Sequence, residues 1–106
     1  MDINTLKKLF RLENWDIQVV EEKTLDVSGN CKMVYNDYQA VIRIQEELND
    51  IEKEKAVIHE LLHLIHRDEM DIVCENLDEK AEKFYMRFHE RSIEQMSKII
   101  HELIHH

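Results

Sequence analysis

The sequence predicts a single α+β domain over residues 1–106, with an N-terminal helix, a small antiparallel β-sheet and two further helices. A chain of 106 residues is long enough for one domain with a modest core. Hydrophobic residues make up 43% of the chain and charged residues 35%, so we expect it to fold. β-branched residues gather between residues 16 and 45, and apolar residues recur at helical spacing on either side.

The first half of the chain reads as one helix followed by strands. Apolar residues three and four apart predict a short amphipathic helix over residues 3–13. Residues 16–27 read as a strand that ends at Ser28-Gly29-Asn30, which contains the only glycine of the chain. Residues 31–45 read as a hairpin that turns at Asn36-Asp37. Alternate residues of its second arm are apolar, so one face of that strand should be buried.

The second half is predicted to form two helices. The first begins at Glu46, and residues 67–77 lose the apolar pattern and read as a loop or a short irregular helix. Asp78 is a typical N-cap residue for a long helix that runs to about residue 104. We expect the buried stripe of the first helix to include Leu48, Ile51, Ile58, Leu62 and Ile65, and that of the last helix Ala81, Phe84, Tyr85, Phe88, Met96, Ile99, Ile100 and Leu103.

Composition argues against several classes of partner. The formal net charge of -9 argues against nucleic acid, because phosphate binding needs a basic surface. No stretch approaches the ~18 consecutive apolar residues that cross a bilayer, and the N-terminus lacks the apolar segment of an export signal. Cys31 and Cys74 have no metal-binding spacing, and we expect them to be reduced thiols of a cytoplasmic protein.

The pattern His-Glu-x-x-His occurs twice, at residues 59–63 (the first motif) and at residues 101–105 (the second motif). The abundance of histidine and glutamate in this chain gives about 0.06 accidental matches. Two accidental matches are therefore improbable, whereas one functional match and one accidental match is credible.

The first motif has the chemistry of a zinc site. His59 and His63 lie four residues apart, so they share one face of a helix and can offer two imidazole nitrogens to one Zn²⁺. Glu60 lies beside them, where it can accept a proton from water as the general base. A catalytic zinc needs three protein ligands and one open position, so a third ligand is required. We expect His66, one turn further on, to lie at the rim of the site.

The second motif lacks a following ligand. His105 is followed by one residue only, and terminal helical turns fray. We therefore expect His101, Glu102 and His105 to form a solvated or partly packed helix end without a metal.

Four acidic residues after the first motif are candidates for its third ligand: Glu75, Glu79, Glu82 and Glu90. Glu75 lies in the segment without a pattern. Glu82 projects into the apolar arc of the last helix, while Glu79 and Glu90 lie at the edge of that arc. Periodicity alone leaves the choice open.

The run VIHELLHLIHRDEM…YMRFHERSIEQM, from Val57 to Met96, resembles the gluzincin metallopeptidases, and in particular small ImmA/IrrE-type and minigluzincin proteins of phages and mobile elements. The resemblance implies a minimal zincin-like fold in which the last helix, the glutamate helix, carries the third ligand. It implies Glu90 for that ligand, with Glu82 as the second choice, and Glu94 as a supporting acid.

These features predict a cytoplasmic zinc metallopeptidase in which His59, His63 and Glu90 hold Zn²⁺. The resemblance implies a specific protein substrate, which we expect to lie along the strand at residues 39–45. Tyr38, Tyr85 and His89 are candidate donors to the oxyanion. The alternatives are a non-catalytic, zinc-stabilised phage protein-binding module, or a latent protease closed by residues 67–76. The oligomeric state stays open.

Overall fold

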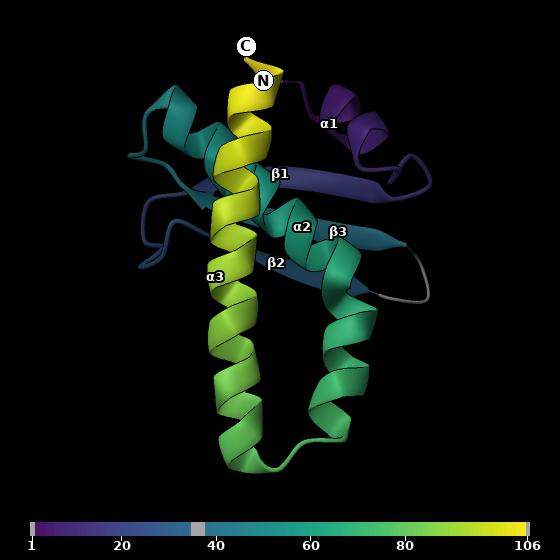
Figure 1. Cartoon of the computed structure of the whole chain (residues 1–106). Coiled ribbons are helices and arrows are strands. Elements are labelled where there is room, and N and C mark those ends of the chain that lie inside the picture. Colours follow the sequence, from purple (N-terminus) through teal and green to yellow (C-terminus); the bar gives the residue numbers. More distant parts are fainter. Residues whose placement is uncertain (1, 35–37, 106) are drawn as a thin grey trace.

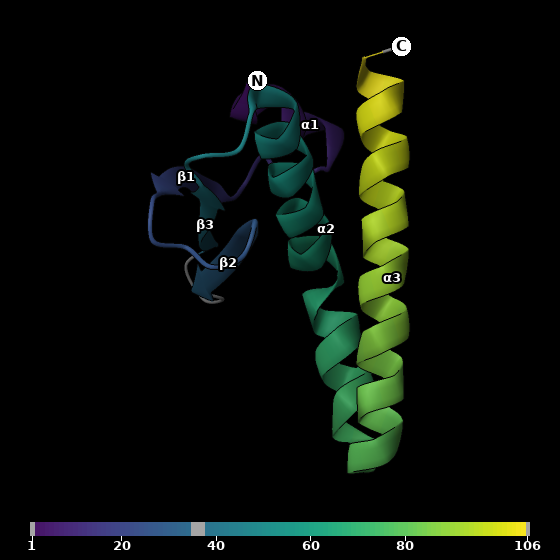
Figure 2. The same ribbon diagram turned by 90° about the vertical axis from the view of Figure 1, so that its left-hand side faces the viewer.

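The computed structural model describes residues 2–34 and 38–105 (Figure 1). The described chain is α+β, as predicted, with a three-stranded mixed sheet. Its elements are α1 (Ile3–Leu9), β1 (Asp16–Glu22), β2 (Gly29–Val34), β3 (Gln39–Gln45), α2 (Asp50–Glu75) and α3 (Glu79–Ile104). The sheet, α2 and α3 form successive layers, with α2 between the sheet and α3 (Figure 2).

α1 is shorter than the helix predicted over residues 3–13. Its one fully buried side chain is Leu6. The helix ends before Arg11, whose φ of 58° lies in the left-handed region that interrupts a right-handed helix. The turn that follows brings Leu12 and Trp15 into the core, where each is 6% exposed.

The prediction of an antiparallel sheet is wrong for one of the two strand pairings. β2 runs antiparallel to β3, as the predicted hairpin requires. The predicted hairpin turn at Asn36-Asp37 falls outside the described residues. β1 runs parallel to β3, with Asp16 opposite Gln39 and Glu22 opposite Gln45. The chain therefore passes from β1 to the far side of the sheet and returns to fill its middle, in the order β1-β3-β2.

β3 lies at the centre of the sheet, so the prediction that a substrate adds along residues 39–45 is wrong, since such addition needs an edge strand. Its inward side chains, Ala40, Ile42 and Ile44, are at most 2% exposed and belong to the main core cluster. Both edges of β3 are hydrogen-bonded to neighbouring strands. Within the described residues, the edges of the sheet are β1 and β2.

α2 begins at Asp50, not at the predicted Glu46, because a capping box formed by Asn49 and Glu52 fixes its first turn there. Asn49 Oδ1 accepts a hydrogen bond from the Glu52 N–H at 2.8 Å, and Glu52 Oε1 accepts one from the Asn49 N–H at 3.2 Å. The central part of the helix is buried on several sides, as expected of the middle layer, whereas Ile51 and Ile65 of the predicted stripe are 59% and 40% exposed.

The prediction of a loop or a short irregular helix at residues 67–77 is wrong for residues 67–75, because α2 continues there as a regular helix to Glu75. This end of α2 and the beginning of α3 extend beyond the sheet as a helical hairpin (Figure 1). This part of α2 packs against α3 only and does not need a wide apolar face. The apolar periodicity of the sequence is therefore lost there although the helix continues. No helix of the described chain is both long enough and apolar enough to cross a membrane.

α3 begins after Asp78, as predicted, with the Asp78 carboxylate accepting a hydrogen bond from the Ala81 N–H at 2.8 Å. Its buried residues are Ile93, Ser97 and His101, one on each successive turn. The predicted buried stripe is wrong for Phe84, Phe88, Met96, Ile99 and Leu103, which are 39–69% exposed. α3 packs mainly against α2, so one narrow face is covered and the adjacent apolar arc stays at the surface.

Candidate metal centre

The first motif lies in the middle layer, between the sheet and α3. Val57, Ile58 and Leu61 are 0% exposed and anchor this part of α2 in the core. His59 and His63 are partly buried and face Glu90 of α3. The helical period explains why the histidines and the core residues lie on different faces of α2. Residues four apart share one face, and the apolar residues between and around them lie on the other faces.

His59, His63 and Glu90, the first cluster, form a compact triangle of ligand atoms. His59 Nε2 lies 2.8 Å from Glu90 Oε1 and 3.1 Å from His63 Nε2, and the remaining side, from His63 Nε2 to Glu90 Oε1, is 3.2 Å. Two ligand atoms that each lie 2.0–2.1 Å from a tetrahedral zinc are about 3.3 Å apart. The donor set of two imidazoles and a carboxylate also suits zinc, so the residues present fit this ion.

Hydrogen bonds do not satisfy this triangle as simply as a cation does. One hydrogen on each Nε2 would satisfy both contacts with Glu90 but would turn two N–H groups toward each other. A hydrogen shared between His59 and His63 leaves a nitrogen lone pair facing the carboxylate oxygen. A cation between the three atoms makes all three contacts favourable.

Glu90 is the only one of the four acidic candidates that lies in the first cluster. Partial burial raises the pKa of Glu90, but the charge of His63 and hydrogen bonds from both histidines outweigh burial and lower it. The carboxylate is therefore kept ionised, as a metal ligand must be.

The other three candidates lie elsewhere. Glu82, the second choice, is close enough to Cys74 to raise the pKa of its thiol, after the larger effect of burial. Glu79 pairs with Lys83 at 3.6 Å, and Glu75 is exposed at the end of α2.

Glu94 orients His59. The His59 Nδ1 lies 3.2 Å from Glu94 Oε2, one turn beyond Glu90 on α3. A hydrogen on Nδ1, donated to this carboxylate, leaves the lone pair of Nε2 directed at the triangle.

Glu60 lies beside the triangle in a much drier environment. It is 8% exposed, and burial raises the pKa of its carboxyl, partly offset by the charges of His63 and His59. A general base with a raised pKa holds a proton more readily.

Gly29, at the start of β2, makes room for Glu60. A Cβ on Gly29 would lie 3.3 Å from the Arg43 backbone oxygen and 3.5–3.6 Å from Glu60 side-chain atoms. The close approach of backbone to side chain favours glycine here, and the residue was not among the predicted site residues. Its being the only glycine in the chain was the available signal.

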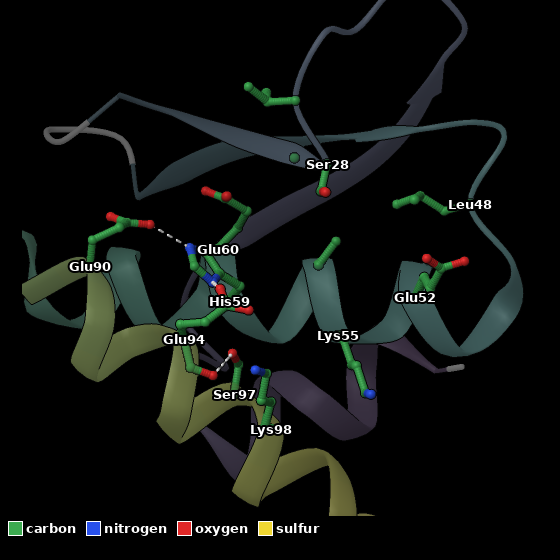
Figure 3. Close-up of a pocket in the computed structure, with 13 residues that line it drawn as sticks. Ser28, Leu48, Glu52, Lys55, His59, Glu60, Glu90, Glu94, Ser97 and Lys98 are labelled. Carbon is green, nitrogen blue, oxygen red and sulfur yellow. Dashed lines mark hydrogen bonds and ion pairs between the residues drawn. The ribbon is translucent and has the colours of Figure 1, made fainter.

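A pocket of about 460 Å³ opens beside the first cluster. His59, Glu60 and Glu90 lie at one end, and Leu48 and Glu52 lie at the other (Figure 3). One wall is the segment from Val27 to Gly29, which leads into the edge strand β2. The remaining lining residues are Lys55, Ala56, Glu94, Ser97 and Lys98.

His66, predicted at the rim, lies outside the first cluster and pairs with Glu69 at 3.3 Å. Of the candidate oxyanion donors, Tyr38 packs edge-on against Trp15 with ring centroids 5.4 Å apart and does not line the pocket. Tyr85 stacks on His89, whose ring lies 5.5 Å from that of His63. His89 is therefore the candidate nearest to the ligands by ring contact.

The second motif is a partly packed helix end, which is one of the two forms predicted for it. His105 is half exposed, but His101 is 9% exposed. Both lie with Glu54 of α2 in a second group of possible ligand atoms, all within 4.8 Å of one another. Glu54 precedes His105 by 51 residues, so a search for a ligand after the motif misses it. The available sequence signal was the position of Glu54, which lies on the same helix face as Ile51 and Ile58 and so places a charge within the predicted apolar stripe.

No protein family, curated protein sequence or solved structure matches this chain.

Proposed function

We propose that this protein is a zinc-dependent metallopeptidase that hydrolyses peptide bonds in a protein substrate. The observation that carries the proposal is the triangle of His59 Nε2, His63 Nε2 and Glu90 Oε1, with the buried carboxylate of Glu60 beside it. This combination supplies three ligands and a base, which is what zinc-assisted hydrolysis requires. The resemblance of residues 57–96 to gluzincins favours the same reaction.

Each residue has a separate task. His59, His63 and Glu90 hold the metal, and Glu94 keeps the His59 ring in the required tautomer. Zinc held there supplies Lewis acidity, which lowers the pKa of water and polarises a peptide carbonyl. Glu60 takes a proton from the attacking water and delivers it to the leaving nitrogen as the C–N bond breaks.

We place the substrate along β2, not along β3. β2 is an edge strand within the described residues, and its first residue, Gly29, lines the pocket that contains Glu60. An extended peptide can add to such an edge through main-chain hydrogen bonds, while side-chain contacts give selectivity. The proposed substrate is thus a protein segment that can become extended.

The experiment compares Glu60→Gln with Glu90→Gln in zinc-loaded protein. Glu60→Gln should keep its zinc and its melting temperature but lose turnover of a quenched-fluorescent peptide library by about 10²–10⁴-fold. Glu90→Gln should lose zinc at the first cluster as well as turnover, because a neutral amide is a poorer ligand. Glu82→Gln is the matched control and should keep both.

The runner-up is a non-catalytic module in which zinc only braces α2 against α3. The narrow buried face of α3 favours it, because a metal shared by two helices would add to a small contact area. Zinc-loaded wild-type protein without turnover on any peptide of the library would favour this module over the peptidase.

We do not propose a latent protease closed by a loop at residues 67–76. Residues 67–75 belong to α2 and do not form a loop over the pocket.

A further inference from the structure

The residues Glu54, His101 and His105, the second cluster, mirror the first cluster across the two helices. In the first cluster α2 contributes the histidine pair and α3 the carboxylate. In the second cluster α3 contributes the histidine pair and α2 the carboxylate. α2 and α3 run in opposite directions side by side, which allows the exchange (Figures 1 and 2).

The distances between ligand atoms in the second cluster lie on either side of the separation expected for two ligands of one zinc ion. His105 Nε2 lies 2.5 Å from Glu54 Oε1, and His101 Nε2 lies 3.9 Å from the same oxygen. Ligand atoms on one tetrahedral zinc are about 3.3 Å apart. The two imidazole rings have centroids 4.6 Å apart, so both can approach one ion through Nε2.

Among these residues, His101 gives the strongest indication of a cation site. The residue is 9% exposed, and its Nε2 is buried without a hydrogen-bond partner among the described residues. A buried polar nitrogen without a partner is costly and rare, and this one faces a carboxylate too distant for a hydrogen bond. A cation between them would satisfy both groups.

Glu54 is a carboxylate only 9% exposed, and its partners are the imidazoles of the cluster, with His105 within hydrogen-bonding distance. The nearby Lys53 is engaged by Glu21 of β1, with Nζ 2.7 Å from Oε1. A pocket of about 930 Å³ adjoins the cluster, and its other lining residues are Val19, Val20, Glu21, Ile44, Asp50, Ile51 and Lys53. Its acidic residues, Glu21 and Asp50, outnumber its one lysine, which favours a cation.

We propose that Glu54, His101 and His105 form a second divalent-metal site, of zinc-type chemistry, that fastens the last turn of α3 to α2. Two imidazoles and one carboxylate match the ligand preferences of zinc. Glu102, the counterpart of Glu60, is exposed, whereas Glu60 is buried beside its histidines. The second site therefore has a structural role and no general base.

The two sites hold separate ions. Glu54 precedes His59 by five residues, about 7.5 Å along α2, and His101 follows Glu90 by eleven residues, about 16 Å along α3. The ions of two-metal catalytic centres are about 3.5–4 Å apart. The second ion would instead hold the end of α3 and thereby keep Glu90 in register with α2.

The test counts bound zinc in untagged chains dialysed against a zinc buffer that strips weak sites. Wild-type protein should bind two zinc ions and His63→Ala one. Adding His105→Ala to His63→Ala should reduce the count to zero and abolish the zinc-induced rise in melting temperature. His105 is half exposed, so this variant should keep its fold, which circular dichroism checks.

Glu102→Gln in the His63→Ala background is the matched control, because it alters an exposed residue of the same motif and should still bind one zinc. A His63→Ala protein that binds no zinc would overturn the second site, as would a double variant that still binds one. Failure of the proposed peptidase is distinguishable, since it would leave the wild-type count at two and remove only turnover.

Discussion

At the scale of single residues, burial and charge distinguish two carboxylates of the candidate metal centre, Glu60 and Glu90. Glu60 is 8% exposed and its pKa is raised, chiefly by burial. The Glu90 side chain is 54% exposed, and His63 and His59 lower its pKa despite partial burial. The same functional group is thereby suited to proton transfer in one position and to metal binding in the other.

Cys31 provides a residue-scale prediction. Burial, and then the charge of Glu60, raise the pKa of its thiol from the ordinary value of 9.0 to about 11. At pH 8 this shift lowers the reactive thiolate fraction about 100-fold. In a Cys74→Ser variant, the native protein should therefore react with a disulfide reagent at least about 100-fold more slowly than the protein in urea. Equal rates would contradict the burial of Cys31.

At the scale of elements, α3 is a helix whose apolar arc and buried face overlap only in part. Ile93, Ser97 and His101 face α2, while Ile99 and Leu103 lie on the exposed side of the arc. Periodicity predicts the width of an apolar arc, but the number of neighbours decides how much of it is covered.

A pair of substitutions in α3 tests this orientation. Ile93 is 1% exposed, so Ile93→Ala should lower the free energy of unfolding by roughly 2–5 kcal/mol. Ile99 is 56% exposed, and Ile99→Ala should change it by no more than about 0.5–1 kcal/mol. Thermal melts of the zinc-loaded proteins would give both values. A larger loss for Ile99→Ala than for Ile93→Ala would mean that α3 is rotated or that another chain covers its exposed arc.

At the scale of the whole molecule, the two proposed metal sites would link α2 to α3, so we expect the stability of the protein to depend on metal. Both clusters join α2 to α3, and the contact between these helices is otherwise narrow. A ligand that binds only the folded state stabilises it in proportion to the logarithm of its concentration.

Metal removal should therefore lower the melting temperature. Zinc at 100 times its dissociation constant contributes about 2.7 kcal/mol per site. For a chain of this size, 1 kcal/mol corresponds to roughly 4–8 °C, so removing zinc should lower the midpoint by about 10–20 °C for each occupied site. Scanning calorimetry with and without a chelator measures this shift, and readdition of zinc should restore the midpoint. An unchanged midpoint would argue against metal sites between the helices.

Local sequence determined the helix caps, the alternation in β3 and the pairing of His59 with His63, because these depend on residues within a few positions of one another. Asp78 and the period of four are visible without knowing any distant contact, and so is the cap at Asn49, although the helix start predicted at Glu46 missed it. The resemblance to gluzincins added Glu90, which the structure places within 3.2 Å of both histidines.

Tertiary structure alone decided which strand is an edge, which side of α3 is covered, and that Glu54 meets His101 and His105. β3 became central because the chain returned after β2 and placed β3 between β2 and β1, parallel to β1, an arrangement that no local pattern specifies. Glu54 and His105 are 51 residues apart and meet only because α2 and α3 are antiparallel neighbours. Local periodicity indicates which residues are buried. The partner of a buried charge depends instead on how whole helices and strands pack against one another.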